Sequence, residues 1–331
     1  MGGDHGPPVT VPAALQVLRQ HPDLSMIIVG RRDEIERCMA VAGAVPSERL
    51  SIHHASETVA MDERPSLALR NKKDSSMRVA LNLVRDGKAG ACVSAGNTGA
   101  LMATARFVLK TLPGVDRPAI CGSMPGLNGY SLLLDLGANI DSSSEELFQF
   151  AVMGSVLAAA TESKTDPTVA LLNVGEEEMK GNDRVKQTAA LLSKSSLNYA
   201  GFVEGDDLYK SKIDVIVCDG FVGNVALKAS EGVANMMMHF AKEEFSRSAY
   251  GRVAALLSAP VLKALRRRMD PRGYNGATLL GLRGIVVKSH GGADQLSLSN
   301  AIEVAIVELE KKVPELISDR LESLLMQRQG I

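Results

Sequence analysis

The feature that most constrains the fold is a repeated pattern along the chain. A short, unbroken apolar run ends in a loop of glycine and polar residues, and a helical stretch follows. In the clearest copy an apolar run ends at Ser94, a Gly-Asn-Thr-Gly turn follows, and an apolar helical pattern starts at Ala100. Apolar runs without polar alternation are typical of parallel strands buried on both faces. The pattern therefore predicts an α/β fold, an αβα sandwich with a mostly parallel central sheet.

The strand-like runs are spread over the whole chain. They cover residues 24–29, 50–53, 91–94, 119–124, 131–136, 169–174, 199–203, 214–218 and 284–288. Amphipathic helical spacing marks residues 76–86, 145–161 and 300–325, the last interrupted at Pro314. Because no repeat, low-complexity stretch or linker separates these segments, we expect residues 1–331 to form a single domain.

Composition excludes several classes of protein. The net charge of −1 over 331 residues excludes a globally basic nucleic-acid binder. No apolar run reaches the roughly 20 residues that a membrane helix needs, and the polar, glycine-rich start is unlike a secretory signal. The four cysteines are widely spaced, which indicates reduced, buried thiols. We therefore predict a cytoplasmic protein.

Candidate binding residues gather at the predicted strand ends. Open α/β sheets bind ligands beyond the carboxyl ends of their strands, and glycine loops before helices suit anions. A tight connection alone would also explain any single loop, but several in the same position favour an anion site. The candidates are Ser94, Gly96, Asn97, Thr98, Gly99, Gly220, Gly223, Asn224, Lys228 and His290.

Common motifs for other chemistries are missing. The sequence holds no GxGxxG or GxxxxGK[ST] motif for nucleotides and no GxSxG motif for a serine nucleophile. The run 176–178 of three glutamates could bind a metal, but Lys180 and the strand-end position argue equally for a polar loop. The residues therefore indicate an enzyme without metal or cofactor, which aligns phosphate against an electrophile and forms no covalent intermediate.

Residues 245–269 differ from the rest of the chain. They combine apolar residues, including Leu256 and Leu257, with a set of cations: Arg247, Arg252, Lys263, Arg266, Arg267 and Arg268. Ala259 and Pro260 divide the segment, so we expect a helical hairpin or a kinked helix. Such a cationic amphipathic segment can lie on an anionic membrane surface, or it can be a solvated helix that packs on the core.

Eight short motifs, in order and over essentially the whole chain, resemble those of the bacterial phosphate acyltransferase family. They occupy residues 1–7 (Met-Gly-Gly-Asp-His-Gly-Pro), 75–80, 94–100 (Ser-Ala-Gly-Asn-Thr-Gly-Ala), 134–139, 173–178, 218–224 (Cys-Asp-Gly-Phe-Val-Gly-Asn), 274–277 and 288–291. The resemblance implies transfer of a fatty acyl chain from acyl carrier protein to inorganic phosphate, in phospholipid synthesis. A membrane acyltransferase then passes the acyl group from acyl phosphate to glycerol 3-phosphate.

The same resemblance implies a fold similar to phosphotransacetylases and isocitrate or isopropylmalate dehydrogenases. It also implies a homodimer attached peripherally to the inner face of the cell membrane. Family members carry a short strand before the Met-Gly-Gly-Asp motif. We therefore expect that restoring such a strand raises soluble yield or activity.

The implied reaction suggests a role for each candidate. Asn97, Thr98 and the backbone of Gly96 and Gly99 would contact the phosphate or the oxyanion. Asn224, with the backbone of Gly220 and Gly223, would form the facing wall. Further expected roles are cationic partners (Lys180, Lys228), a proton donor to the leaving thiolate (His290), a site border (Asp4, His5), and carrier docking (Arg266, Arg267, Arg268, Lys72, Lys73).

Three alternatives remain at this point. A phosphotransacetylase that uses acyl-coenzyme A would need a nucleotide site but no membrane-facing helix. An isocitrate-type dehydrogenase shares the architecture, although its metal-binding aspartates are not recognisable here. A non-catalytic scaffold would bind membranes and recruit lipid enzymes without making acyl phosphate.

Overall fold

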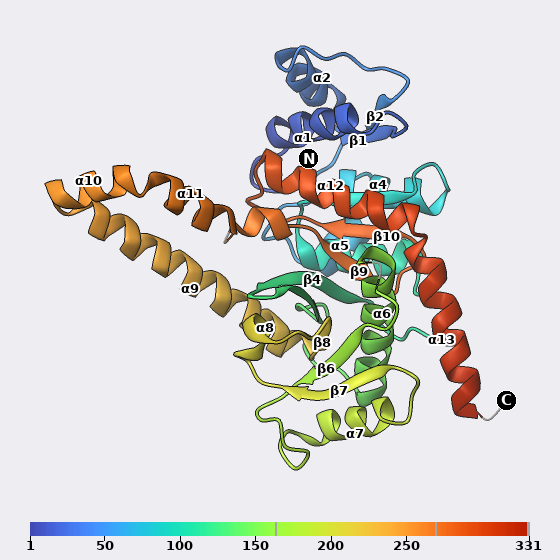
Figure 1. Cartoon of the computed structure of the whole chain (residues 1–331). Coiled ribbons are helices and arrows are strands. Elements are labelled where there is room, and N and C mark those ends of the chain that lie inside the picture. The colour runs from blue at the N-terminus through green and yellow to red at the C-terminus, as the bar shows by residue number, and fades with distance from the viewer. Residues whose placement is uncertain (163, 269, 330–331) are drawn as a thin grey trace.

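The computed structural model describes residues 1–162, 164–268 and 270–329. Figure 1 shows a central sheet with helices on both sides, as the sequence predicts. Every predicted run forms a strand: β1 (Met26–Gly30), β2 (Leu50–His54), β3 (Ala91–Ser94), β4 (Ala119–Gly126), β5 (Gly129–Leu134), β6 (Thr168–Leu172), β7 (Asn198–Val203), β8 (Val215–Val217) and β10 (Ile285–Lys288). One strand was not predicted, β9 (Ala277–Leu280).

The main sheet has the order β3-β10-β9-β4-β5-β8-β6-β7, and β1 and β2 form a separate parallel pair. Neighbours are parallel except β9 with both of its partners and β4 with β5. The sheet is thus mostly parallel, but it has two halves. β3, β4 and β10 run in one direction, and the remaining strands of this sheet run in the other.

The helices between the strands have these bounds: α1 (Pro7–Gln20), α2 (Arg32–Val41), α3 (Pro65–Asn71), α4 (Ser76–Arg85), α5 (Thr98–Leu109), α6 (Ser144–Glu162), α7 (Asp183–Leu192), α8 (Asp207–Lys210), α9 (Gly220–Ser246), α10 (Ala249–Leu257), α11 (Ala259–Arg268), α12 (Gln295–Glu310) and α13 (Val313–Gln329). Polar side chains fix several starts. Ser75, Asn97, Asn182 and Asp219 each accept a hydrogen bond from a backbone N–H in the first turn of the following helix.

Helices cover both faces of the sheet, as the unbroken apolar runs require. Leu132 and Leu134 of β5 pack in a cluster with α6 and α13, whereas Leu133 between them packs in a cluster with α4 and α5. The same alternation on β10 directs Val286 toward α5, and Ile285 and Val287 toward α12. Each strand thus stabilises two apolar layers at once.

One part of the fold leaves this compact body. Figure 1 shows α9 extending from the sheet as an arm that α10 and α11 complete. Only Gly220 and Gly223 of α9 are buried, and no residue of α10 is. α10 ends at Leu257 and α11 begins at Ala259, so the predicted break falls at Ser258, two residues before Pro260. Among the described residues, no helix combines the length and apolar character of a membrane span.

Candidate functional site

A first group of candidate residues lies at the carboxyl ends of β3 and β10. Ser94 and Lys288 are register partners at the last position of these strands. The N-terminal segment crosses both ends, because the Asp4 N–H donates to the Gly291 carbonyl over 2.9 Å. A narrow crevice of about 10 Å³ lies among Gly2, Gly3, His5, Gly6, Val9, Thr10, Ala95, Gly291, Ala293 and Leu298. Three segments distant in sequence therefore meet at one place.

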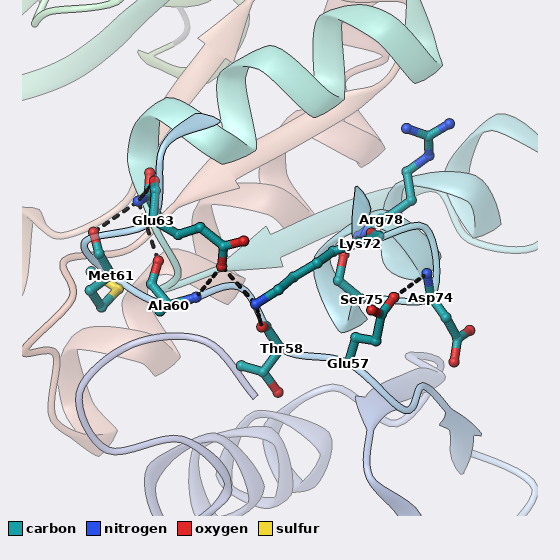
Figure 2. A network of polar contacts seen from close by, with 10 residues as sticks. Glu57, Thr58, Ala60, Met61, Glu63, Lys72, Asp74, Ser75 and Arg78 are labelled. Carbon is teal, nitrogen blue, oxygen red and sulfur yellow. Dashed lines mark hydrogen bonds and ion pairs between the residues drawn. The ribbon is translucent and has the colours of Figure 1, made fainter. Parts of the chain in front are cut away.

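Asn97 does not offer its side chain to a ligand. Its Nδ2 lies within hydrogen-bonding distance of the carbonyls of Ala60, Met61 and Glu63, at 3.3, 2.8 and 3.0 Å, and its Oδ1 accepts from Ala100 N at 2.9 Å. The same loop is held by Lys72, which donates to Glu63 over 2.7 Å and to the Thr58 carbonyl over 2.6 Å (Figure 2). These contacts engage the whole amide, so we expect Asn97 to act as a positioning residue that ties the 58–63 loop to α5, in place of the expected ligand contact.

The start of α5 exposes the backbone of Thr98 and Gly99. They are the first two residues of α5, both are exposed, and the first N–H groups of a helix have no partner within it. These two N–H groups and the helix dipole can bind an anion. Gly96, in contrast, is buried and its N–H donates to Ser94 Oγ over 3.2 Å. Ser94 and Gly96 therefore shape the loop.

Lys288 is the residue that the sequence reasoning missed. Its side chain is buried, its Nζ lies 3.4 Å from the Ala95 carbonyl, and it donates to the Ser289 carbonyl. The pKa of this amine is lowered to about 8, mainly by burial. The charge of Lys228 also lowers this pKa, whereas the charge of Asp4 raises it. A lysine that ends a run of buried strand residues was the available signal, because charged side chains are rarely buried without function or partner.

The contacts of His290 fix the position of its ring proton. Its ring Nδ1 accepts from the Gly292 N–H over 3.1 Å, so the hydrogen-bond network assigns the ring proton to Nε2. The residue is exposed, and its backbone N–H donates to Asn275 Oδ1 over 3.1 Å. His290 is thus an exposed residue of the first group, and its ring carries an N–H at Nε2.

A second group lies where β5 and β8 end, in the half of the sheet with the opposite direction. Asp135 is fully buried and accepts hydrogen bonds from the backbone N–H groups of Ile120, Gly137, Ala138 and Asn139. Burial raises the pKa of Asp135, and these hydrogen bonds act in the opposite direction. The carboxylate fixes the 135–139 loop against which α9 begins.

Gly220 and Gly223 pack α9 onto that loop. A Cβ atom at Gly223 would lie 1.9 Å from the Asp135 carbonyl oxygen, and one at Gly220 would lie 2.5 Å from that of Asn139. Their N–H groups donate to the carbonyls of Asp219 and Asn139. Glycine is needed here for close approach, and both N–H groups already have protein partners, so we expect these two backbones to position α9 and not to donate to the substrate.

Asn224 lies one residue beyond these glycines and is exposed. A Cβ atom added at Gly137 would lie 3.3 Å from Asn224 Cβ, so the backbone of Gly137 lies close to the start of this side chain. Two expected cations have partners on the surface: Lys180 pairs with Glu177 at 2.8 Å, and Lys228 with Glu231 at 2.7 Å. The Glu177 hydrogen bond raises the pKa of Lys180. Lys180 therefore remains charged near neutral pH.

α9 connects the two groups. It begins beside the 135–139 loop, and the charge of Lys228 in its third turn acts on Lys288 in the first group. The remaining candidates are apart from both groups. Leu256 and Leu257 are exposed at the end of α10. Arg266, Arg267 and Arg268 lie in α11, but their side chains fall outside the described part of the chain.

Metal ligands are not grouped in this protein as far as it is described. Within residues 1–162, 164–268 and 270–329, no cluster of three or more His, Cys, Asp or Glu side chains is arranged to hold a metal ion. The three glutamates at 176–178 belong to this range.

The fold is similar to that of known phosphotransacetylases. The phosphotransacetylase from Streptococcus pyogenes superposes with a TM-score of 0.61 at 19% identity, covering 92% of this chain and 91% of that one. EutD phosphotransacetylase from Staphylococcus aureus gives a TM-score of 0.58 at 16% identity, with 92% of each chain covered.

Sequence relatives are much closer. A family model described as fatty acid synthesis protein matches residues 1–316. Phosphate acyltransferase from Alkalilimnicola ehrlichii is 59% identical over 100% of this chain and 96% of its own length. The protein of the same name from Nitrosococcus oceani is 58% identical over 100% of this chain and 97% of its own. The chain therefore belongs to the phosphate acyltransferase family of enzymes.

Proposed function

We propose that this enzyme transfers a fatty acyl chain from acyl carrier protein to inorganic phosphate, giving acyl phosphate and free carrier for phospholipid synthesis. The observation that carries the proposal is the exposed N-terminus of α5 next to the buried amine of Lys288. Free N–H groups at a helix start and a lysine are two common ways of binding phosphate.

The reaction needs correct orientation of the phosphate and the thioester more than it needs chemical activation of the phosphate. A phosphate oxygen attacks the thioester carbonyl carbon, the carbon–sulfur bond breaks, and the carrier leaves as a thiolate. The N–H groups of Thr98 and Gly99, with Lys288, would hold the phosphate. The amide of Asn224 would donate to the oxyanion, and the Nε2–H of His290 would donate a hydrogen bond to the thiolate, which takes up the proton of the attacking hydrogen phosphate. Because phosphate is itself the nucleophile, no side chain has to form a covalent bond.

The test is a direct assay of the product. The protein is incubated with acyl carrier thioester and phosphate, and acyl phosphate is trapped with hydroxylamine. We expect acyl phosphate from the carrier thioester and much less from acyl-coenzyme A. The reverse preference would favour the phosphotransacetylase alternative, which the fold similarity supports. Membrane binding without any product would favour the scaffold.

Asn224 provides a second test of the mechanism. Asn224→Ala should lower kcat by about 100-fold, as loss of one oxyanion donor does, while the thermal unfolding midpoint changes little because the side chain is exposed. Asn128→Ala, which changes an exposed amide on the β4–β5 turn, is the matched control. A large loss of stability with normal turnover of the folded enzyme would contradict the catalytic role of Asn224.

The exposed arm formed by α9, α10 and α11 suggests what the enzyme contacts in the cell. We infer that a homodimer forms through α9 and that the α10–α11 end touches the inner face of the cell membrane. Exposed apolar side chains on the arm support both contacts: Val233, Met236, Met237, Phe240, Tyr250, Val253, Leu256, Leu257 and Val261. Membrane contact would bring acyl phosphate close to a membrane glycerol-3-phosphate acyltransferase.

A further inference from the structure

The surface around Phe107 has no role in the transfer described above. Phe107 lies on α5 and is 52% exposed. The Arg78 guanidinium carbon and the Lys110 Nζ each lie 4.8 Å from the centre of its ring. Arg106 lines the same surface hollow of about 350 Å³, and Arg283 reaches its edge by donating to the Thr111 carbonyl over 3.0 Å. We call Arg78, Arg106, Phe107, Lys110 and Arg283 the α5 basic patch.

The cations of this patch are not neutralised by the protein. In the part of the chain that the structure describes, none of the four has a carboxylate within 4.0 Å, whereas Lys72 nearby pairs with Glu63 at 2.7 Å. Arg106 reaches only the Asp116 carbonyl, at 3.4 Å. Burial, and then the charge of Arg85, lower the pKa of Arg78, so like charges crowd this surface. The patch therefore presents a positive field to solvent.

The backbone of Lys110 adds a second observation. Its φ of 64° and ψ of 170° lie in a region that glycine adopts freely and other residues occupy only at an energetic cost. A glycine would end α5 here with less strain. The lysine instead places its amine over the Phe107 ring. Strain of this kind is found mostly where a side chain has a function.

We propose that the α5 basic patch docks the acidic face of the carrier protein that delivers the thioester. This inference rests on the proposed function, in which the acyl donor is such a carrier. An exposed aromatic ring flanked by arginine is the residue combination that interfaces favour, and opposite charge guides the encounter.

The position of the patch fits delivery to the site. α5 begins at the site with Thr98, and Phe107 lies nine residues further along, about 14 Å at the rise of an α-helix. A carrier seated on the patch would extend its flexible prosthetic arm along α5 toward Thr98. Figure 2 shows Arg78 extending away from the Glu63–Lys72 pair, which secures the loop beside the site.

The test reverses two charges of the patch. Arg106→Glu with Lys110→Glu is compared with Lys186→Glu and Lys194→Glu, exposed lysines on and just after α7. The probe is holo acyl carrier protein without an acyl chain, titrated at low and high salt. We expect the patch variant to lose at least tenfold in carrier affinity, to lose most of the salt dependence, and to raise KM for acyl carrier by a similar factor. The KM for phosphate and the rate with acyl pantetheine, which lacks the carrier, should stay within twofold.

Two results would overturn the docking surface. One is unchanged carrier affinity in the patch variant, and the other is an equal loss in the α7 control. Loss of binding to phosphatidylglycerol vesicles with carrier affinity retained would assign the patch to the membrane instead. If the wild type makes no acyl phosphate but the patch variant still loses carrier affinity, the proposed function is wrong and the docking surface stands.

Discussion

Single residues of the same type serve different purposes in this protein. Asn97 and Asn224 both follow glycines at strand ends, yet the first has its whole amide engaged by the protein and the second is exposed. Lys288 is buried and belongs to the first group of site residues, whereas Lys180 lies on the surface and pairs with Glu177. The chemical availability of a side chain depends on its neighbours, and those come from distant segments.

Asn97 should matter for stability. Asn97→Ala removes the cap of α5 and leaves the carbonyls of Ala60, Met61 and Glu63 without their donor. We expect the free energy of unfolding to fall by about 2–3 kcal/mol, the sum of a lost cap and an unpaired buried group. Denaturant titration measures this. Asn182→Ala, which removes only the cap of α7, should cost about 1 kcal/mol; equal costs would contradict the bridging role of Asn97.

A buried carboxyl group outside the site makes stability depend on pH. Glu308 of α12 is 1% exposed, and Thr278 Oγ1 of β9 donates to it. Burial raises the pKa of this carboxyl to about 7. The folded chain thus binds the proton more tightly than the unfolded chain. Its contribution to stability is present below the unfolded pKa, near 4.5, and is lost as the pH rises to about 7.

Glu308→Gln should remove this dependence. The variant is expected to gain stability relative to wild type as the pH rises from 5 to 8, by at most about 3 kcal/mol, because it cannot ionise. Denaturant unfolding of both proteins at several pH values gives the difference directly. Glu310→Gln, an exposed neighbour on the same helix, is the control. A wild-type-to-variant difference that is constant over this range would contradict the assignment.

Among the helices and strands, the sequence pattern predicted the elements with a clear apolar pattern better than those that are defined by their partners. The paired helices α10 and α11 and the break between them follow from an amphipathic run around Pro260. β9 was missed because a run of four residues between Gly276 and Gly281 is short for a strand, and only its pairing with β4 and β10 defines it. Elements that depend on partners are poorly marked in a single sequence.

The end of the arm should bind membranes. Leu256 and Leu257 are 76% and 77% exposed at the end of α10, so Leu256→Glu with Leu257→Glu should abolish flotation with phosphatidylglycerol vesicles. Val41→Glu with Val45→Glu is the matched control, because these side chains are 91% and 77% exposed at and just after the end of α2, which lies apart from the arm (Figure 1). Flotation of the α10 variant at the wild-type level would exclude this contact.

At the scale of the whole molecule, an arm with this much exposed apolar surface suggests a second copy of the chain. Val233, Met236, Met237 and Phe240 recur at helical spacing on one stripe of α9. Sedimentation should therefore give twice the 35.2 kDa of one chain. Met237→Glu with Phe240→Glu should give one chain mass with unchanged helix content, and the Val41 and Val45 control should stay dimeric. A wild type that sediments as a single chain would contradict the interface.

Apolar periodicity and short motifs are local properties, so the layered α/β fold, most strand segments, the helical break near Pro260 and the family could be predicted from the sequence alone. The direction of each half of the sheet depends on contacts between distant segments and is seen only in the folded protein. The same contacts place Asn97 and Asn224 in different groups, with Lys288 buried in the first. The physical reason is that strand pairing and burial join segments far apart in the chain, and these contacts determine which polar atoms remain available to a substrate.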